Sequence, residues 1–240
     1  MFDFNSLIEN HLAREFRPKT QGRYYPSEIG KCLRDVWYSY KQPLPLPMEK
    51  VKIFEAGNIM HHFVAEVMRS EKNQQVKLLD NELPFQLQIR DFIVSGRIDD
   101  LLLVLADNKR LLVEVKSVAR LDFTNEPQPQ HMIQLQLYLH ALRKSHNVDA
   151  GALLYIEKNT LQAKTFIIDY DERLAAEALD RFSKLHNFLV AGKLPPPEAR
   201  LRAEIGWMCK RCDYRERCFS DTSDSMLSAF AGGNSASASS

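Results

Sequence analysis

GRIDDLLLVLADNKRLLVEVK, residues 96–116, is the stretch that decides the fold of this chain. It belongs to two apolar runs, residues 92–105 and 110–118, which are joined by the turn-forming residues 106–109. Two apolar runs around an Asp-Asn turn are typical of a β-hairpin. We therefore expect two antiparallel strands here.

Three charged side chains interrupt this apolar hairpin. Residues two apart on a strand share a face, so Glu114 and Lys116 point the same way. If Asp107-Asn108 forms a two-residue turn, Asp99 lies opposite Lys116 and Glu114 is its diagonal neighbour on the same face. A three-residue loop would break that arrangement. With the two-residue turn, two carboxylates and a lysine converge.

Such a cluster among leucines and valines is costly unless something neutralises it. Magnesium or manganese bound by Asp99 and Glu114 would do so, because hard cations prefer carboxylate oxygen. The ion can lower the pKa of a bound water, and Lys116 would orient that water or stabilise the transition state. The alternative is a structural ion pair between Glu114 and Lys116 at a hairpin edge.

Two helical motifs supply partners for this cluster. Gly57 precedes His61 by one turn, which would let a helix approach the sheet closely while His61 reaches the metal. The neighbouring His62 leaves the choice of histidine open. Gln134 and Tyr138 share a helical face shortly after the Lys116 strand, and are candidates for positioning a phosphodiester.

The four cysteines form a further pattern. Cys209, Cys212 and Cys218 follow the spacing C-x2-C-x5-C, and Cys32 stands alone near the other end. In a chain with no export signal, this spacing indicates a metal site rather than disulfides. The alternatives are unrelated buried thiols, or a structural zinc site completed by Asp213 or His186.

The composition is that of an ordinary globular protein. Of 240 residues, 45% are hydrophobic and 26% are charged, and 32 basic against 31 acidic residues give a net charge of +1. This balance excludes a histone-like polycation, so a nucleic-acid partner must bind a local basic surface. No apolar run approaches the about 20 residues of a membrane span, and the N-terminus lacks the basic region of a secretory signal. We therefore expect a cytoplasmic protein with no membrane partner.

Periodicity predicts the remaining elements. Helical spacing is present over residues 2–12, from about 26 to 40, 49–70, 128–145 and 171–189. Strand-like segments cover residues 78–89, broken at Pro84, and residues 150–156 and 162–168.

In this order the motifs resemble the PD-(D/E)xK nuclease superfamily, in particular its RecB-type branch with an iron–sulfur cluster and above all the CRISPR-associated Cas-four nucleases. The resemblance covers about residues 24–219, and a superfamily proline–aspartate is replaced here by Ile98-Asp99. Each motif is weakly specific, but their common order is a strong signal. The motifs that carry it are Cys32 within residues 30–34, Gly57 with His61, residues 96–99, residues 114–116, Gln134 with Tyr138, and the closing C-x2-C-x5-C.

The resemblance implies an α/β fold with a restriction-endonuclease-like core, in which helices flank a mixed central sheet. The metal ligands it implies are His61, Asp99, Glu114 and the Val115 carbonyl. It makes Lys116 the catalytic lysine and makes Gln134 and Tyr138 accessory active-site residues. Cys32, Cys209, Cys212 and Cys218 would hold an iron–sulfur cluster, usually [4Fe–4S], that closes the C-terminal segment onto an N-terminal helix.

The implied activity is metal-dependent cleavage of DNA, often single-stranded or at overhangs and from an end, with magnesium or manganese. Related proteins trim prespacers beside the CRISPR adaptation integrase. The chain would then divide into an N-terminal helical region (1–48), a nuclease core (49–194), an iron–sulfur segment (195–220) and a disordered tail (221–240). Alternatives are a recombination, repair or viral RecB-like nuclease, a catalytically silent DNA-binding scaffold, and a zinc-stapled structural protein.

A DNA path is also suggested by the sequence. If the cysteines join the two ends, basic residues from both would form one surface able to follow phosphates. These residues are Arg14, Arg17, Lys19, Arg23, Lys31, Lys210, Arg211, Arg215 and Arg217. The aromatic candidates for base stacking are Tyr24, Tyr25, Trp37 and Trp207, although any one of them is more commonly a core residue.

Overall fold

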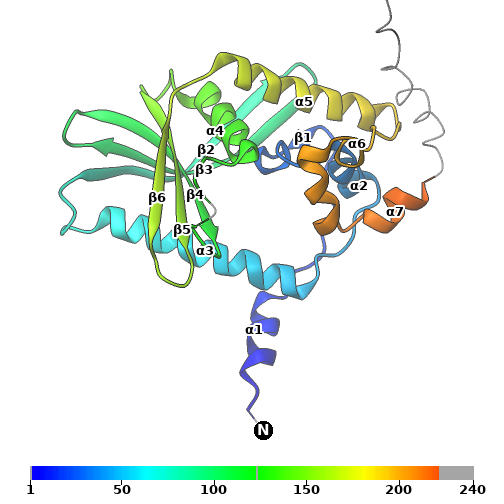
Figure 1. Ribbon diagram of the computed structural model, residues 1–240, viewed down its shortest axis with the longest axis horizontal. Helices are drawn as coiled ribbons and strands as arrows, with labels where there is room; N and C mark the ends of the chain where they lie inside the picture. The colour runs from blue at the N-terminus through cyan, green and yellow to red at the C-terminus, as the bar shows by residue number, and fades with distance from the viewer. Residues whose placement is uncertain (1, 123, 222–240) are drawn as a thin grey trace, which may run out of the picture.

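The computed structural model describes residues 2–122 and 124–221, and its centre is a mixed β-sheet covered by helices (Figure 1). The strands are β1 (Arg23–Tyr24), β2 (Val76–Ile89), β3 (Phe92–Val104), β4 (Lys109–Val118), β5 (Ala150–Glu157) and β6 (Ala163–Ile168). The sheet order is β1-β3-β4-β5-β6, with β2 along the other edge of β3. β4 and β5 are parallel, while β3–β4, β2–β3 and β5–β6 are antiparallel. The mixed sheet expected for the nuclease superfamily is therefore present.

Helices occupy the remaining parts of the chain. They are α1 (Phe4–Leu12), α2 (Leu33–Lys41), α3 (Met48–Arg69), α4 (Pro129–Leu142), α5 (Glu172–Val190), α6 (Glu198–Leu201) and α7 (Arg215–Ser220), with 3-10 segments η1 (Pro26–Glu28) and η2 (Ala203–Arg211). In the described ranges, no helix is both long and apolar enough to cross a membrane. The expected tail lies, from residue 222 onward, outside the described residues.

The β3–β4 hairpin has a different register from the expected one. Its pairs run from Val104–Lys109 to Asp100–Val113, with a turn over residues 105–108 in which Asn108 adopts a positive φ of 57°. The pairing ends at Asp100–Val113, so Asp99 lies beyond the last pair and is not opposite Lys116 as expected. The turn has four residues rather than two, so the register differs from the expected one by two residues.

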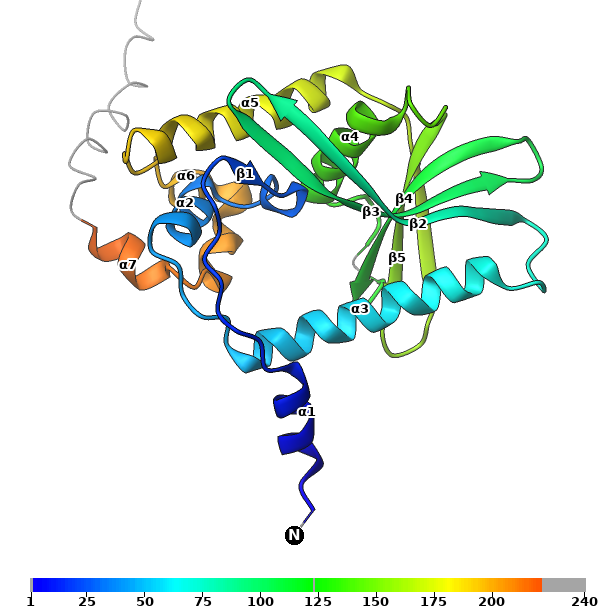
Figure 2. The ribbon, with the colours of Figure 1, turned by 180° about the vertical axis from the view of Figure 1, so that it is seen from behind.

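The two faces of the sheet carry separate apolar layers. On one face, Val113 and Val115 of β4 pack with Val64 of α3. On the other, Leu112 of β4 packs with Leu135 of α4. Figure 2 shows α3 crossing the sheet on the side away from α4. Successive side chains of β4 are buried alternately on the two faces of the sheet. This explains why the sequence of this internal strand is an almost continuous apolar run.

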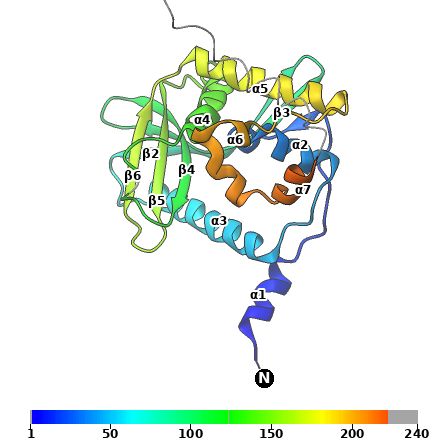
Figure 3. The same ribbon diagram turned by 45° about the vertical axis from the view of Figure 1, so that its right-hand side comes forward.

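A third apolar cluster joins the two ends of the chain. Trp37 of α2 and Phe182 of α5 pack in one core with Tyr214, which precedes α7. Figure 3 shows α2, α6 and α7 gathered beneath the end of α5, while α1 projects away from the body. Segments that are far apart in the sequence are thus held together by ordinary apolar burial.

Two local expectations need correction. The second helix does not open at Pro26, because a 3-10 turn covers Pro26–Glu28 and α2 begins only at Leu33. Pro84 does not break β2, in which it pairs with Arg97. A proline has no N–H to donate to a neighbouring strand. β2 is an edge strand, so on its side away from β3 no such donor is needed.

Close packing at two glycines fixes how the N-terminal segment meets the core. A Cβ on Gly96 of β3 would lie 2.8 Å from Pro26 Cδ, and one on Gly30 would lie 2.4 Å from Gln130 Cβ at the start of α4. Both distances are shorter than real Cβ contacts. The N-terminal segment therefore lies directly against β3 and α4 because these positions have no side chain.

Candidate active site

β4 and α4 together build a buried polar network. Lys116 Nζ donates to Glu114 Oε1 at 2.6 Å and to Gln134 Oε1 at 3.2 Å. Gln134 Nε2 in turn donates to Glu114 Oε1 at 2.8 Å and to Tyr138 Oη at 3.1 Å. The structure thus brings these four predicted residues together, and the amide of Gln134 has its orientation fixed by its two sets of partners.

Glu114 has a carboxylate oxygen that this network leaves without a hydrogen-bond partner. Its side chain is only 4% exposed, and its Oε2 is buried with no hydrogen-bond partner. Burial raises the pKa of Glu114, and the charge of Lys116 offsets part of that effect. Burial also acts to lower the pKa of Lys116, but the adjacent Glu114 carboxylate outweighs it and holds that pKa above its usual range. The lysine therefore keeps its proton, and a buried carboxylate oxygen is left without a partner.

Asp99 connects β3, β4 and α3. Its Oδ2 accepts the backbone N–H of Val115 at 2.7 Å, and its Oδ1 lies 3.1 Å from His61 Nδ1. Burial acts to lower the pKa of His61, but the hydrogen bond and charge of Asp99 outweigh it and raise that pKa. His62 is exposed, so of the two histidines it is His61 that contacts the Asp99 carboxylate.

Gly57 plays a smaller part than its spacing suggested. A Cβ on Gly57 would lie 3.7 Å from Ser117 Oγ, an ordinary contact distance. α3 does approach β4 at this point, but an alanine would fit. The close approach of helix and sheet therefore does not depend on this glycine.

The donors at this site fit a hard divalent cation in kind. Carboxylate oxygens from Asp99 and Glu114 are the ligands that magnesium and manganese prefer, and Glu114 Oε2 is an acceptor that no protein group among the described residues satisfies. Across residues 2–122 and 124–221, no three His, Cys, Asp or Glu side chains are gathered as a metal site. His61 contacts Asp99, whereas Glu114 contacts Lys116 and Gln134, so the predicted ligands are arranged as two hydrogen-bonded groups.

The network opens onto a large cleft of about 1080 Å³. Lys116 and Gln134 line one part of it, and Met208 and Arg211 of η2 line another. Its basic lining residues are Arg14, Arg17, Lys19, Lys31, Lys50, Lys116 and Arg211, and its acidic ones are Glu15, Asp35, Glu55 and Asp213. Basic side chains predominate, and the cleft is larger than the about 300–1,000 Å³ of ordinary small-molecule pockets.

The aromatic candidates for base stacking divide into two pairs. Tyr24 and Trp37 are core residues, 0% and 8% exposed, and cannot stack on a ligand. Trp207 is 45% exposed and lines the cleft, whereas Tyr25 is exposed but does not line it. Of the four, Trp207 is therefore the one that is both exposed and beside the cleft.

A residue pair that the motif reading missed lies beside Lys116. Tyr155 of β5 is the register partner of Lys116 across the parallel β4–β5 pairing. Its hydroxyl accepts the backbone N–H of Gln128 at 3.0 Å and lies 2.9 Å from His131 Nδ1. His131 precedes Gln134 by one helical turn and lines the cleft. That i, i+3 spacing was the available sequence signal.

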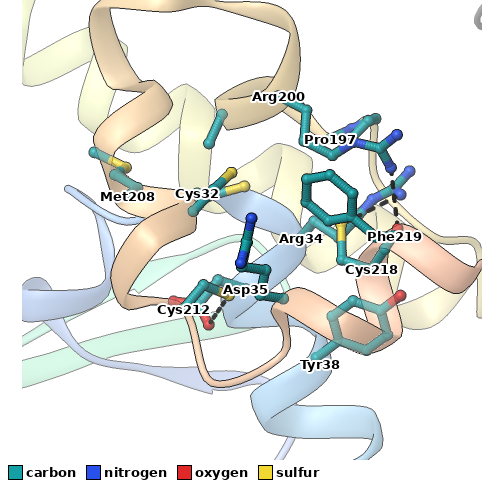
Figure 4. A pocket seen from close by; sticks show the side chains of 13 residues that line it. Cys32, Arg34, Asp35, Tyr38, Pro197, Arg200, Met208, Cys212, Cys218 and Phe219 are labelled. Carbon is teal, nitrogen blue, oxygen red and sulfur yellow. Dashed lines mark hydrogen bonds between the residues drawn. The ribbon is translucent and has the colours of Figure 1, made fainter.

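The four cysteines are free thiols that line one small pocket (Figure 4). Cys212 Sγ donates to Asp35 Oδ1 at 3.4 Å, and Arg34 Nη1 lies 3.7 Å from Cys218 Sγ. Burial and the nearby Asp35 carboxylate raise the pKa of Cys212 to about 12. Cys32 and the C-terminal triple thus line the same pocket, although among the described residues they are not gathered closely enough to form a metal site.

The two residues considered for a zinc site lie elsewhere. His186 bonds to Tyr24 Oη at 2.8 Å and to Asp91 Oδ2 at 3.1 Å, and Asp213 pairs with Lys50. Neither lines the cysteine pocket. The structure therefore gives no support to the alternative in which one of them completes a three-cysteine zinc site.

The two ends are also joined by a polar contact. Arg181 of α5 pairs with Glu198 of α6 at 2.8 Å and donates to the carbonyl of Lys31 at 2.9 Å. Glu198 Oε1 accepts the N–H of Leu33, the first residue of α2, at 2.8 Å. This contact links the N- and C-terminal segments.

Comparison with known proteins defines the class to which this fold and site belong. The model of the PD-(D/E)XK nuclease superfamily matches residues 11–219, and the chain therefore belongs to that superfamily. Members of this superfamily generally use magnesium or manganese. A comparison with the curated proteins gives no match.

A solved structure shares this fold. The crystal structure of SSO0001 matches with a TM-score of 0.57 and 20% identity, covering 88% of this chain and 90% of that one. An alkaline exonuclease from Laribacter hongkongensis has a TM-score of 0.45 and 16% identity, covering 71% and 89% of the two chains. A phage related exonuclease from Haemophilus somnus 129PT has a TM-score of 0.45 and 14% identity, covering 77% and 99%.

Proposed function

We propose that this protein is a metal-dependent DNA nuclease that hydrolyses phosphodiester bonds. The observation that carries the proposal is the unpartnered, buried Glu114 Oε2 within the Lys116–Gln134 network. A purely structural ion pair would have no need to leave one carboxylate oxygen unsatisfied next to a basic cleft. A site that binds a cation and a phosphate would need such a free carboxylate oxygen.

Each residue then has a defined task. A magnesium or manganese ion, held by His61, Asp99, Glu114 and the Val115 carbonyl, would supply an activated water and stabilise charge on the phosphate. Lys116 holds its proton against Glu114 and presents a positive charge to the developing phosphorane. Gln134 and Tyr138 keep Glu114 in place.

The substrate that we propose is single-stranded DNA or an overhang, attacked from an end. Lys31 and Arg211 line the cleft and, within the described residues, have no ion-pair partner. Unpaired basic side chains and the exposed Trp207 ring suit a flexible strand whose phosphates and bases are both accessible.

We further propose that Cys32, Cys209, Cys212 and Cys218 hold an iron–sulfur cluster, most simply [4Fe–4S]. Four thiols around one pocket match the four ligands that such a cluster needs. Free thiols also suit a reducing compartment such as the cytoplasm. In this proposal residues 195–220 form the cluster segment and residues 1–48 supply its fourth ligand to a core of residues 49–194.

The biological setting that we propose is prespacer trimming beside the CRISPR adaptation integrase, which rests on the order of the sequence motifs. A repair or viral nuclease is the alternative setting, and a silent DNA-binding scaffold is the alternative activity. Trimming of overhanging duplex ends only when the integrase is present would favour the first. Equal trimming of any overhang without the integrase would favour a repair or viral nuclease.

Cleavage of labelled single-stranded DNA with manganese tests the activity. Wild-type protein should degrade it, Asp99→Asn should not, and Asp107→Asn, in the exposed turn of the same hairpin, should behave as wild type. Binding of DNA without cleavage by the wild-type protein in either metal would identify the scaffold instead.

A further inference from the structure

His131 has one ring nitrogen committed to the protein and one available. Its Nδ1 lies 2.9 Å from the hydroxyl of Tyr155. Within residues 2–122 and 124–221, no hydrogen bond to its Nε2 is found. The side chain lines the cleft, as do Lys116 and Gln134.

Tyr155 determines which nitrogen carries the proton. The Tyr155 hydroxyl is buried and already accepts the N–H of Gln128 at 3.0 Å, so its own proton is directed to a different acceptor. Among the described residues, the acceptor available to that proton is His131 Nδ1, 2.9 Å away, and we assign the proton to this bond. A neutral imidazole that accepts at Nδ1 carries its proton at Nε2, so the ring offers an N–H donor to the cleft.

The charge state of His131 agrees with this assignment. Burial and the nearby positive charge of Lys116 lower the pKa of His131 to about 3. The ring is therefore neutral at physiological pH, and the register pairing of Tyr155 with Lys116 places it beside the lysine. A neutral donor next to a cation is suited to an anionic ligand that needs both.

We propose that His131 binds the DNA backbone, donating its Nε2–H to a phosphate oxygen of the strand that Lys116 contacts. This proposal rests on the nuclease function and adds a residue to its substrate site. Tyr155 is then a positioning residue that holds the ring in the required tautomer. His131 and Gln134, spaced i, i+3, lie together on the face of α4 that contacts the substrate.

Two substitutions separate this role from a structural one. An asparagine retains a polar atom at the position of Nδ1, whereas a glutamine retains one at the position of Nε2. If His131 serves only as the partner of Tyr155, His131→Asn should preserve function and His131→Gln should not. If His131 binds phosphate, the order is reversed.

The measurement is DNA affinity by fluorescence anisotropy, with labelled oligothymidine in EDTA so that no cleavage occurs. A hydrogen bond to a charged group is worth enough for His131→Ala and His131→Asn to weaken binding about tenfold. His131→Gln should remain within about threefold of wild type by the same scale. His140, also on α4, bonds to Tyr170 Oη at 3.0 Å but lies outside the cleft, so His140→Ala is the matched control and should bind normally.

Abasic oligonucleotides distinguish a phosphate contact from a base contact. The His131→Ala loss should be the same on abasic and normal strands, and a loss confined to strands with bases would overturn the phosphate assignment. Wild-type affinity in His131→Ala and His131→Asn would refute any DNA contact. Failure of the wild-type protein to bind or cleave DNA would instead refute the nuclease function, so the two failures are distinguishable.

Discussion

Asp99 Oδ2 accepts the backbone N–H of Val115 at 2.7 Å, just beyond the last β3–β4 backbone pair, Asp100–Val113. The carboxylate therefore replaces a main-chain acceptor where the two strands separate. One side chain both completes the sheet and presents its second oxygen to His61. The proposed metal site and the fold are therefore coupled at this residue.

This coupling predicts different effects for two substitutions of Asp99. Asp99→Asn keeps an oxygen that can accept the Val115 N–H, so the free energy of unfolding should change little while DNA cleavage is lost. Asp99→Ala leaves the buried N–H unpaired and should lose about 1–3 kcal/mol of stability as well as cleavage. Urea denaturation and cleavage assays on both variants check this, and equal stability of the two would contradict the structural role.

Lys116 should matter for both catalysis and the charge balance of Glu114. Lys116→Met leaves Glu114 buried without its charged partner, although Gln134 still donates to it, so the variant should lose about 3–5 kcal/mol of stability at pH 8. Because the folded-state pKa of Glu114 is raised, the native state takes up its proton first as pH falls, and stability should recover between pH 8 and pH 5.

Denaturation at each pH in EDTA measures this recovery. Lys109→Met, an exposed position on the same strand, should show none. In single-turnover assays Lys116→Met should lower the cleavage rate far more than DNA affinity, and Lys116→Arg should restore it only in part, because a planar guanidinium does not reproduce a point charge. A variant that loses affinity alone would make Lys116 a phosphate anchor.

Two glycines should respond in opposite ways to alanine. Gly30→Ala would push a methyl group against Gln130 Cβ, so we expect about 1–3 kcal/mol of destabilisation. Gly57→Ala meets only an ordinary contact inside α3 and should stabilise by up to about 1 kcal/mol through helix propensity. Thermal unfolding of the two variants gives the comparison, and destabilisation by both would indicate that α3 lies closer to β4 than described.

The Arg181–Glu198 contact should anchor the C-terminal segment. The two side chains are 19% and 17% exposed, and Arg181→Met leaves Glu198 with one partner fewer in a partly buried position. We expect about 1–3 kcal/mol of destabilisation and faster proteolysis within residues 195–220. Lys184→Met removes an exposed i, i+4 pair of the same helix and should cost less than about 0.5 kcal/mol. Equal effects would show that Arg181 is not an anchor.

The proposed cluster gives a prediction that separates structure from catalysis. Cys32→Ser should remove the absorbance near 400 nm and lower iron content, as should Cys209→Ser, because a four-thiolate cluster needs every ligand. Residual cleavage should persist, since Arg181 and the apolar core still join the two ends. Iron and zinc analysis of anaerobically purified protein decides the metal. Stoichiometric zinc without iron would overturn the cluster, and full iron in Cys32→Ser would exclude that ligand.

Local sequence pattern determined the elements of this protein and the faces of its central hairpin. The period-two alternation places Glu114 and Lys116 on one face whatever the register, and the spacing of Gln134 and Tyr138 places them on one side of α4. These relationships depend on neighbours in the chain. They therefore survived a turn that was two residues longer than expected.

Contacts between distant segments were decided only by tertiary structure. The register of Tyr155 against Lys116 follows from how the α4 crossover packs the parallel strand β5 onto β4, and no local periodicity encodes it. The same applies to the choice of His61 over His62 and to the burial that leaves Glu114 Oε2 without a partner. The local sequence pattern determines the face of a helix or strand on which a side chain lies. The packing of whole helices and strands determines which residues that face contacts.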